Sequence, residues 1–140
     1  MIVLDTNVVS EPMKAAGNPV VTAWLDRQVA DTLYLTATSL AELMVGVQLL
    51  PAGRRKDRIA GALNELLARL FGARILPFDR EAAIMYARVV DRARAAGHAV
   101  SVADGQIAAI AATHGFIVAT RDVTPFAAAG VPVVDPWRER

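Results

Sequence analysis

Short apolar runs alternate with longer amphipathic segments along the chain. Each run is bounded by turn-forming residues, which is the pattern expected of a buried parallel strand. The predicted strands are Ile2–Leu4, Leu33–Leu35, Arg74–Phe78, Phe116–Ala119 and Val131–Val134.

The longer segments have the period of helices. One apolar stripe is formed by Leu40, Leu43, Met44 and Val47. Pro51 must end the helix that carries this stripe. Three further helices are predicted, each followed by a glycine suited to end it: Arg55–Phe71, Arg80–Ala96 and Val102–His114. Alternating strands and helices predict an α/β fold with a mainly parallel sheet, because parallel neighbours need crossover connections.

Four acidic residues are predicted to meet at one edge of this sheet, outside the carboxyl ends of the strands, where such folds form their sites. Asp5 directly follows the first strand, and Asp122 follows the strand Phe116–Ala119. Glu42 is expected in the first turn of the helix after the second strand. Asp104 begins the helix before Phe116–Ala119, and this helix must run antiparallel to its strand, so its N-terminus returns to the same edge.

Each acid also has a structural interpretation. Ser39 with Glu42, and Ser101 with Asp104, have the spacing of a capping box, although Asp is shorter than the usual Glu or Gln. Asp5 suits an Asx turn, and Asp122 suits a loop. We favour a shared site because other acids are expected on exposed faces, away from this edge: Asp26, Asp57, Glu65, Asp91 and Glu139.

Composition limits the kinds of site that fit. The 140 residues, 54% of them hydrophobic, suit one compact domain spanning residues 1–140. With no cysteine and two histidines, a metal would have to be held mainly by oxygen. No apolar stretch approaches the ~20 residues that span a bilayer, and no signal peptide is recognisable, so we expect a cytoplasmic protein that does not bind membranes. The formal net charge of +1 does not indicate nucleic-acid binding by itself.

Crowded carboxylates repel one another, so a divalent cation is their natural partner. Mg²⁺ and Mn²⁺ prefer oxygen ligands and retain bound water. Such ions activate water and stabilise charge on a phosphoryl oxygen. The predicted acidic edge is therefore suited to phosphodiester hydrolysis.

The order and spacing of five blocks of sequence are informative: IVLDTNVVSE, TATSLAELMVGV, SVADGQIAAIAATHG, VATRDVTPF and GVPVVDPW. Over nearly the whole chain they closely resemble the PIN-domain ribonucleases, especially the VapC-type toxins of type II toxin-antitoxin systems and their FitB-like branch. The resemblance implies a three-layer PIN-like fold whose central, mainly parallel five-stranded sheet is flanked by helices. It also implies a metal-dependent endoribonuclease that hydrolyses structured RNA.

The resemblance assigns the same four acids to the catalytic site: Asp5, Glu42, Asp104 and Asp122. It implies that Asp5 and Asp104 are direct ligands of Mg²⁺ or Mn²⁺, and that Glu42 and Asp122 complete the pocket, hold a second ion or orient its water. Which of these two residues acts as the general base is left open. Supporting polar positions, which equally fit local turn hydrogen bonds, are Thr6, Asn7 and Thr120.

The block around the fourth acid departs from the family pattern. Many relatives have TRN-x-x-D-F where this chain has TRDVTPF. Asp122 therefore occupies the position of the asparagine, and Pro125 stands where an aspartate is common. This variation is known within the FitB-like branch. Arg121, beside Asp122, is the best-placed candidate for binding substrate phosphate.

The resemblance also implies partners. A cognate VapB/FitA-like antitoxin would lay its C-terminal segment across helices of the toxin and often place an arginine in the acidic pocket. A homodimer is expected, with promoter DNA bound only through the antitoxin. One apolar stretch is a candidate for the antitoxin groove, although core packing explains it better: Val20, Val21, Trp24, Leu25 and Val29.

Three other functions fit parts of this pattern. A haloacid-dehalogenase-like phosphatase needs a D-x-D motif, but the residue two positions after Asp5 is Asn7, which argues against it. A catalytically inactive PIN-like binding module, acting only through its partner complex on promoter DNA, stays open. So does a nuclease that acts on DNA, which cleavage assays on labelled RNA and DNA would separate.

Overall fold

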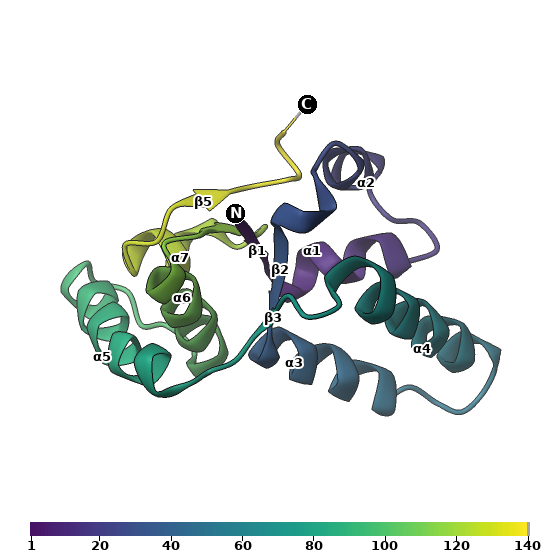
Figure 1. Ribbon diagram of the computed structural model, residues 1–140, viewed down its shortest axis with the longest axis horizontal. Helices are drawn as coiled ribbons and strands as arrows, with labels where there is room; N and C mark the ends of the chain where they lie inside the picture. The colour runs from purple at the N-terminus through teal and green to yellow at the C-terminus, as the bar shows by residue number, and fades with distance from the viewer. Residues whose placement is uncertain (140) are drawn as a thin grey trace.

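The computed structural model describes residues 1–139. Within this range the sheet has five strands, all paired in parallel, in the order β3-β2-β1-β4-β5 (Figure 1). They are β1 (Ile2–Leu4), β2 (Leu33–Thr36), β3 (Ile75–Leu76), β4 (Ile117–Ala119) and β5 (Val133–Val134). The five predicted strands are confirmed, although β3, β4 and β5 are shorter than expected. The direction in which strands are added reverses between β1 and β4, so this pair forms the switch point of the sheet.

Helices cover both faces of the sheet, which confirms the three-layer arrangement (Figure 1). One face carries α1 (Thr6–Ser10), α2 (Pro19–Asp26), α3 (Ala37–Gln48) and α4 (Arg54–Leu66). The other carries α5 (Arg80–Ala95), α6 (Val102–His114) and α7 (Val123–Ala128). Short turns are η1 (Glu11–Met13), η2 (Ala30–Thr32) and the π-helical η3 (Leu67–Phe71), which continues α4.

The central strands send alternate side chains into two cores, as the period of a strand requires. Val3 of β1 and Val118 of β4 pack in the core beneath α5, α6 and α7. The next residues, Leu4 and Ala119, pack in the core on the opposite face. These strands are buried on both faces, and the residues that follow them are held in place by both cores.

Helix α6 is packed so closely that it needs small residues. The positions from Ile107 to Ala111 are fully buried. At Gly105 an added Cβ would lie 2.7 Å from a ring carbon of Tyr86 on α5, closer than side chains tolerate. Asp104 precedes this glycine, so the packing of α5 against α6 also fixes the position of Asp104.

The caps of α6 and α3 test the two predicted capping boxes. The Ser101 hydroxyl accepts a hydrogen bond from the Asp104 amide (3.1 Å), and Gly115 ends α6 at φ +69°, as predicted. In α3 the prediction is wrong, because Thr36 is the N-cap and its hydroxyl accepts from the Ser39 amide (3.0 Å). Strand β2 runs directly into α3 at Ala37, so Glu42 lies in the second turn rather than the first.

No helix within residues 1–139 combines the length and the apolar composition needed to cross a membrane.

Candidate active site

Asp5 is held at the end of β1 by hydrogen bonds with three residues. Its amide donates to the Ala119 carbonyl (2.9 Å), which joins the ends of β1 and β4. Its Oδ1 accepts from the Thr6 amide (2.8 Å) and so caps α1, while Oδ2 accepts from the Thr120 hydroxyl (2.8 Å). The residue is only 5% exposed. The sheet therefore fixes the Asp5 carboxylate at the switch point.

Burial is also the main electrostatic influence on Asp5, whose pKa it raises to about 6. Hydrogen bonds from Thr120 and Thr6 oppose this rise, whereas the charges of Asp104 and Glu42 add to it. Burial likewise raises the pKa of Asp104, followed by the charge of Asp122, while the bond with Ser101 opposes the rise and the charge of Glu42 adds to it. The four predicted acids therefore lie close enough together to act on one another's charge.

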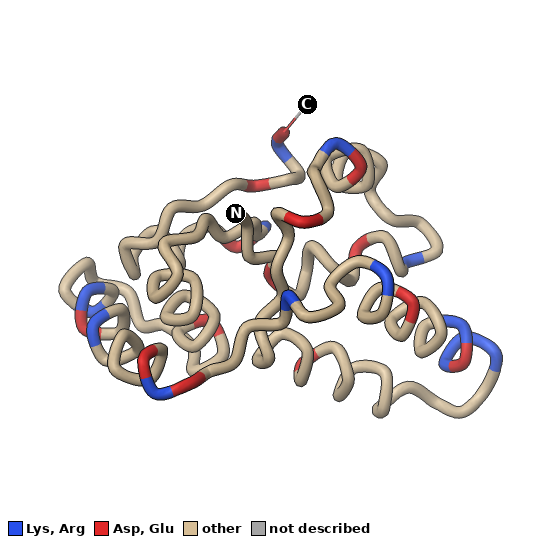
Figure 2. Tube along the Cα trace, in the orientation of Figure 1, with Lys and Arg blue, Asp and Glu red and all other residues tan. Residues whose placement is uncertain are grey.

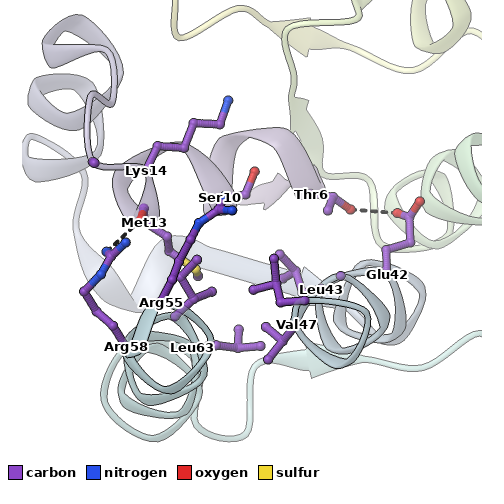
Figure 3. A pocket seen from close by; sticks show the side chains of 14 residues that line it. Thr6, Ser10, Met13, Lys14, Glu42, Leu43, Val47, Arg55, Arg58 and Leu63 are labelled. Atoms are coloured by element: carbon purple, nitrogen blue, oxygen red, sulfur yellow. Dashed lines mark hydrogen bonds between the residues drawn. The ribbon is translucent and has the colours of Figure 1, made fainter. Parts of the chain in front are cut away.

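Glu42 and Asp122 lie on the open side of the site, and both are exposed. The Thr6 hydroxyl donates to Oε1 of Glu42 (2.7 Å), which links α1 to α3 (Figure 3). Asp122 stands at the N-terminus of α7 without a capping bond from its side chain, and its amide donates to the Thr120 hydroxyl (3.0 Å). The Asp122 carboxylate is thus left available at the edge of the site.

The three supporting polar residues link these elements rather than only forming local turns. The buried Thr120 hydroxyl donates to Asp5 and accepts from the Asp122 amide, so it connects two of the acids. Asn7 donates to Asp5 through Nδ2 (3.5 Å) and accepts from the Arg121 amide through Oδ1 (3.4 Å). Thr6 connects Asp5 to Glu42. Together they hold the segment after β4 against the start of α1.

The chemistry of these donors fits a hard divalent cation. Among residues 1–139, none of the four carboxylates forms an ion pair with a lysine or arginine. In the same range no three His, Asp or Glu side chains already gather as ligands for one ion. One or two carboxylates supplemented by water and substrate oxygens is the coordination that Mg²⁺ favours, so the arrangement fits magnesium better than a structural zinc site.

A groove of about 370 Å³ begins beside Glu42 and runs between η1, α3 and α4 (Figure 3). Apolar side chains that line it include Met13, Leu43, Val47 and Leu63. Thr6 and Glu42 lie at one end, and the basic residues Lys14, Arg55 and Arg58 lie at the other. Arg55 and Arg58 belong to the basic cluster of Arg54, Arg55, Lys56 and Arg58. Figure 2 shows this cluster in blue at the start of α4. The groove therefore has an apolar floor and ends of opposite charge.

Sequence reasoning placed the candidate groove elsewhere. In the stretch from Val20 to Val29, Val21 and Trp24 are buried in the core, in agreement with the core-packing interpretation. A second feature that sequence reasoning missed is Trp137, whose ring lies 5.2 Å from the guanidinium carbon of Arg121. No local pattern joins positions 121 and 137, so only the fold reveals this contact.

The chain was compared with known proteins. The family profile described as "PIN domain" matches residues 2–131. "VapC ribonuclease Y4jK" of Sinorhizobium fredii is 49% identical, covering 98% of this chain and 98% of the relative. "Toxin FitB" of Neisseria gonorrhoeae is 45% identical, covering 99% of this chain and 100% of the relative.

Solved structures agree with this relationship. The chain is similar to one in "Structure of FitAB bound to IR36 DNA fragment", with a TM-score of 0.94, 43% identity and coverage of 100% of this chain and 98% of the other. For "Crystal Structure of FitAcB from Neisseria gonorrhoeae" the TM-score is 0.89 at 45% identity, covering 99% of each chain. The match to the family profile over most of the sequence, together with relatives this similar, shows that the chain belongs to the PIN domain family.

Proposed function

We propose that the protein is a divalent-metal-dependent endoribonuclease and the toxin of a VapBC-type toxin-antitoxin pair. The observation that supports the proposal is that Asp5, Glu42, Asp104 and Asp122 lie near enough to act on one another's charge, with Asp5 buried and its pKa raised. The names of the relatives, a VapC ribonuclease and the toxin FitB, support the same assignment.

Asp5 and Asp104 are assigned as the ligands of Mg²⁺, with Mn²⁺ as the alternative ion. Glu42 and Asp122 complete the pocket, where they hold a second ion or orient the attacking water. When bound, the metal activates that water and offsets charge on the phosphoryl oxygen. Thr120 and Thr6 hold Asp5 and Glu42 in place through hydrogen bonds of 2.8 and 2.7 Å. At neutral pH the Asp5 carboxyl, with a pKa of about 6, is mostly ionised and able to bind a cation.

The test is cleavage of labelled RNA and of DNA with the same sequence, with and without Mg²⁺. Asp5→Asn and Asp104→Asn should each lower RNA cleavage on the order of 100-fold or more, because each removes a charged ligand. Asp91→Asn, which changes an exposed acid on α5, is the matched control and should cleave normally. Cleavage that survives both site substitutions would refute the metal mechanism. Cleavage of DNA but not of RNA would show that the substrate is DNA.

The groove is the proposed seat of the antitoxin. Its apolar floor suits the apolar side chains of a bound segment, the basic end suits acidic residues, and the Glu42 end suits an arginine. The names FitAB and FitAcB describe related chains in complexes, and one of these complexes is bound to DNA. We therefore assign contacts with promoter DNA to the antitoxin. We also propose that the toxin is a homodimer, which light scattering of the purified protein would test.

Val47→Asp places a charge on the groove floor and should weaken antitoxin binding at least about tenfold, as burial of an unpaired charge is costly. RNA cleavage by the free toxin should be retained. Val29→Asp changes a residue that is 67% exposed in the stretch first considered for the groove, and it serves as the control. Titration calorimetry with purified antitoxin gives the affinities. Equal loss from both variants, or loss from Val29→Asp alone, would place the antitoxin outside this groove.

A further inference from the structure

We propose that Trp137 is a positioning residue for substrate: its ring holds the guanidinium of Arg121 beside the acidic edge, where Arg121 binds a phosphate of the RNA. This inference rests on the proposed nuclease function and deepens it. It assigns a role to the segment after β5, which neither the acidic site nor the groove uses.

The backbone places Arg121 between two parts of the site. It follows Thr120, which binds Asp5, and precedes Asp122. Its amide donates to Oδ1 of Asn7 (3.4 Å), which holds this part of the chain against the start of α1. The side chain of Arg121 therefore leaves the backbone beside the carboxylates, where hydrogen bonds to Asp5 and Asn7 hold the adjoining segment in place.

The side chain of Arg121 is exposed but not without contacts. Its guanidinium carbon lies 5.2 Å from the centre of the Trp137 ring, within the range of a cation–π interaction. It forms no ion pair with any acid among residues 1–139, and no hydrogen bond from the guanidinium to that part of the chain is present. The aromatic contact thus restrains the cation while its N–H donors stay available for an anion.

The carboxylate of Glu11 acts on the charge of Arg121 but already has other partners. Glu11 is 6% exposed, pairs with Lys14 (2.9 Å) and accepts from the Asn18 amide (3.1 Å). The Lys14 bond is the main reason that its pKa lies below the usual value, and Arg121 makes the smallest contribution. Glu11 therefore attracts Arg121 weakly and does not take up its donors.

Trp137 is itself held firmly enough to position another residue. Its amide donates to Oδ1 of Asp135 (2.9 Å), directly after β5. Its ring packs, half-buried, against the core that contains Leu4 and Ala119, the last residues of the two strands at the switch point. The ring thus connects Arg121 to the same core that fixes Asp5.

Phosphate is the chemistry that these features favour. A planar guanidinium binds phosphate oxygens through paired hydrogen bonds, and restraining it in advance lowers the entropy lost on binding. The site it adjoins is the one assigned to phosphodiester hydrolysis. Arg121 would then bind a phosphate close to the scissile bond, beside the carboxylates that would hold the cation.

The experiment measures KM and kcat on a short labelled RNA for Arg121→Gln, Trp137→Leu and the double variant. Arg121→Gln should raise KM about 10- to 100-fold through the loss of a charge-assisted contact. Trp137→Leu should raise KM about two- to fivefold, the usual strength of an exposed cation–π contact, with kcat nearly unchanged. In the Arg121→Gln background, Trp137→Leu should add nothing. Trp137→Phe, which keeps an aromatic face, should restore most of the affinity.

Controls separate positioning from folding. Arg69→Gln removes another exposed arginine, which pairs with Glu65 across one helical turn, and should leave KM unchanged. Thermal unfolding of Trp137→Phe and Trp137→Leu shows whether the fold is intact. The salt dependence of RNA affinity should weaken in Arg121→Gln by about the slope of one phosphate contact, whereas Trp137→Leu, which keeps the cation, should leave that slope nearly unchanged.

The inference is overturned if Trp137→Leu raises KM equally with and without Arg121, or if it changes kcat alone. It is also overturned if Trp137→Phe behaves like Trp137→Leu while both proteins are folded. Failure of the nuclease assignment has a different signature, namely no Mg²⁺-dependent cleavage by the unaltered protein. Fluorescence anisotropy of labelled RNA with Asp104→Asn protein then still reports whether Arg121 and Trp137 contribute jointly to binding.

Discussion

At the scale of single residues, Asp5 combines two properties that usually exclude each other. It is almost fully buried, yet the role proposed for its carboxylate, binding a cation, requires it to be charged. Hydrogen bonds from Thr6 and Thr120 offset part of the cost of burying that charge. The remaining cost appears as the raised pKa, which means that the folded protein binds a proton at Asp5 more tightly than the unfolded chain does.

This cost predicts how stability depends on pH. Folding raises the Asp5 pKa from 3.8 to about 6, so without metal the free energy of unfolding should fall as pH rises from about 4 to about 6, and then level off. Asp5→Asn should remove this fall and, near pH 7, be more stable than the unaltered protein by on the order of 3 kcal/mol. Urea denaturation in EDTA across pH 4–8 measures the free energy of unfolding of both proteins. Parallel curves for the two proteins would contradict the assignment.

The position of this residue, but not its surroundings, could be predicted from the sequence. A buried run that ends at an acid places that acid at the end of a strand. The hydrogen bond from Thr120 to Asp5 spans 115 positions, and the contact between Arg121 and Trp137 joins the segments that follow β4 and β5. Such contacts depend on strand order and side-chain rotamers, which no local pattern contains.

At the scale of elements, α6 and α3 show when local signals suffice. Ser101 and Gly115 bound α6 without competitors, so both of its ends were predicted correctly. In α3 two hydroxyl residues compete to be the N-cap, and Thr36 takes the role because β2 passes directly into the helix. Helices α1 and α7 were not predicted because they are too short for a helical period to emerge.

The two serines give a matched pair of variants. Ser101→Ala removes the cap of α6 and should lower the free energy of unfolding by about 1 kcal/mol. Ser39→Ala should change it by less than about 0.5 kcal/mol or increase it, since the Ser39 hydroxyl is buried with no hydrogen-bond partner within the described chain. Chemical denaturation at constant pH compares them. The capping-box prediction for α3 would be restored if Ser39→Ala proved the more damaging of the two.

At the scale of the whole molecule, the three-layer fold brings acids from four separate segments to one edge. Parallel strands, with helices that run antiparallel to them, are enough to predict that the four acids share this edge. The strand order, with its reversal between β1 and β4, could not be predicted, because the apolar runs are too similar to specify their neighbours. The reversal sets Asp5 beside Thr120 and so gives the site its centre.

Metal binding should therefore stabilise the whole domain. Mg²⁺ at about 100 times its dissociation constant should add about 2.7 kcal/mol to the free energy of unfolding and raise Tm, with EDTA reversing the effect. Asp91→Asn should respond in the same way as the unaltered protein, whereas Asp5→Asn and Asp104→Asn should not. Differential scanning fluorimetry at pH 7.5 gives the comparison. A full response from either site variant would remove that residue from the set of ligands.

The pairing of β1 with β4 has a consequence for synthesis on the ribosome. Asp5 is made early, but its partner Thr120 follows 115 residues later, roughly 6 to 23 s at the usual rate of translation. In a nascent chain that lacks β4, Asp5 does not yet have the partners that complete the site, so we expect no nuclease activity. Under the proposed nuclease function the site therefore assembles only after β4 has been made, and a neutralising partner can already be present by then.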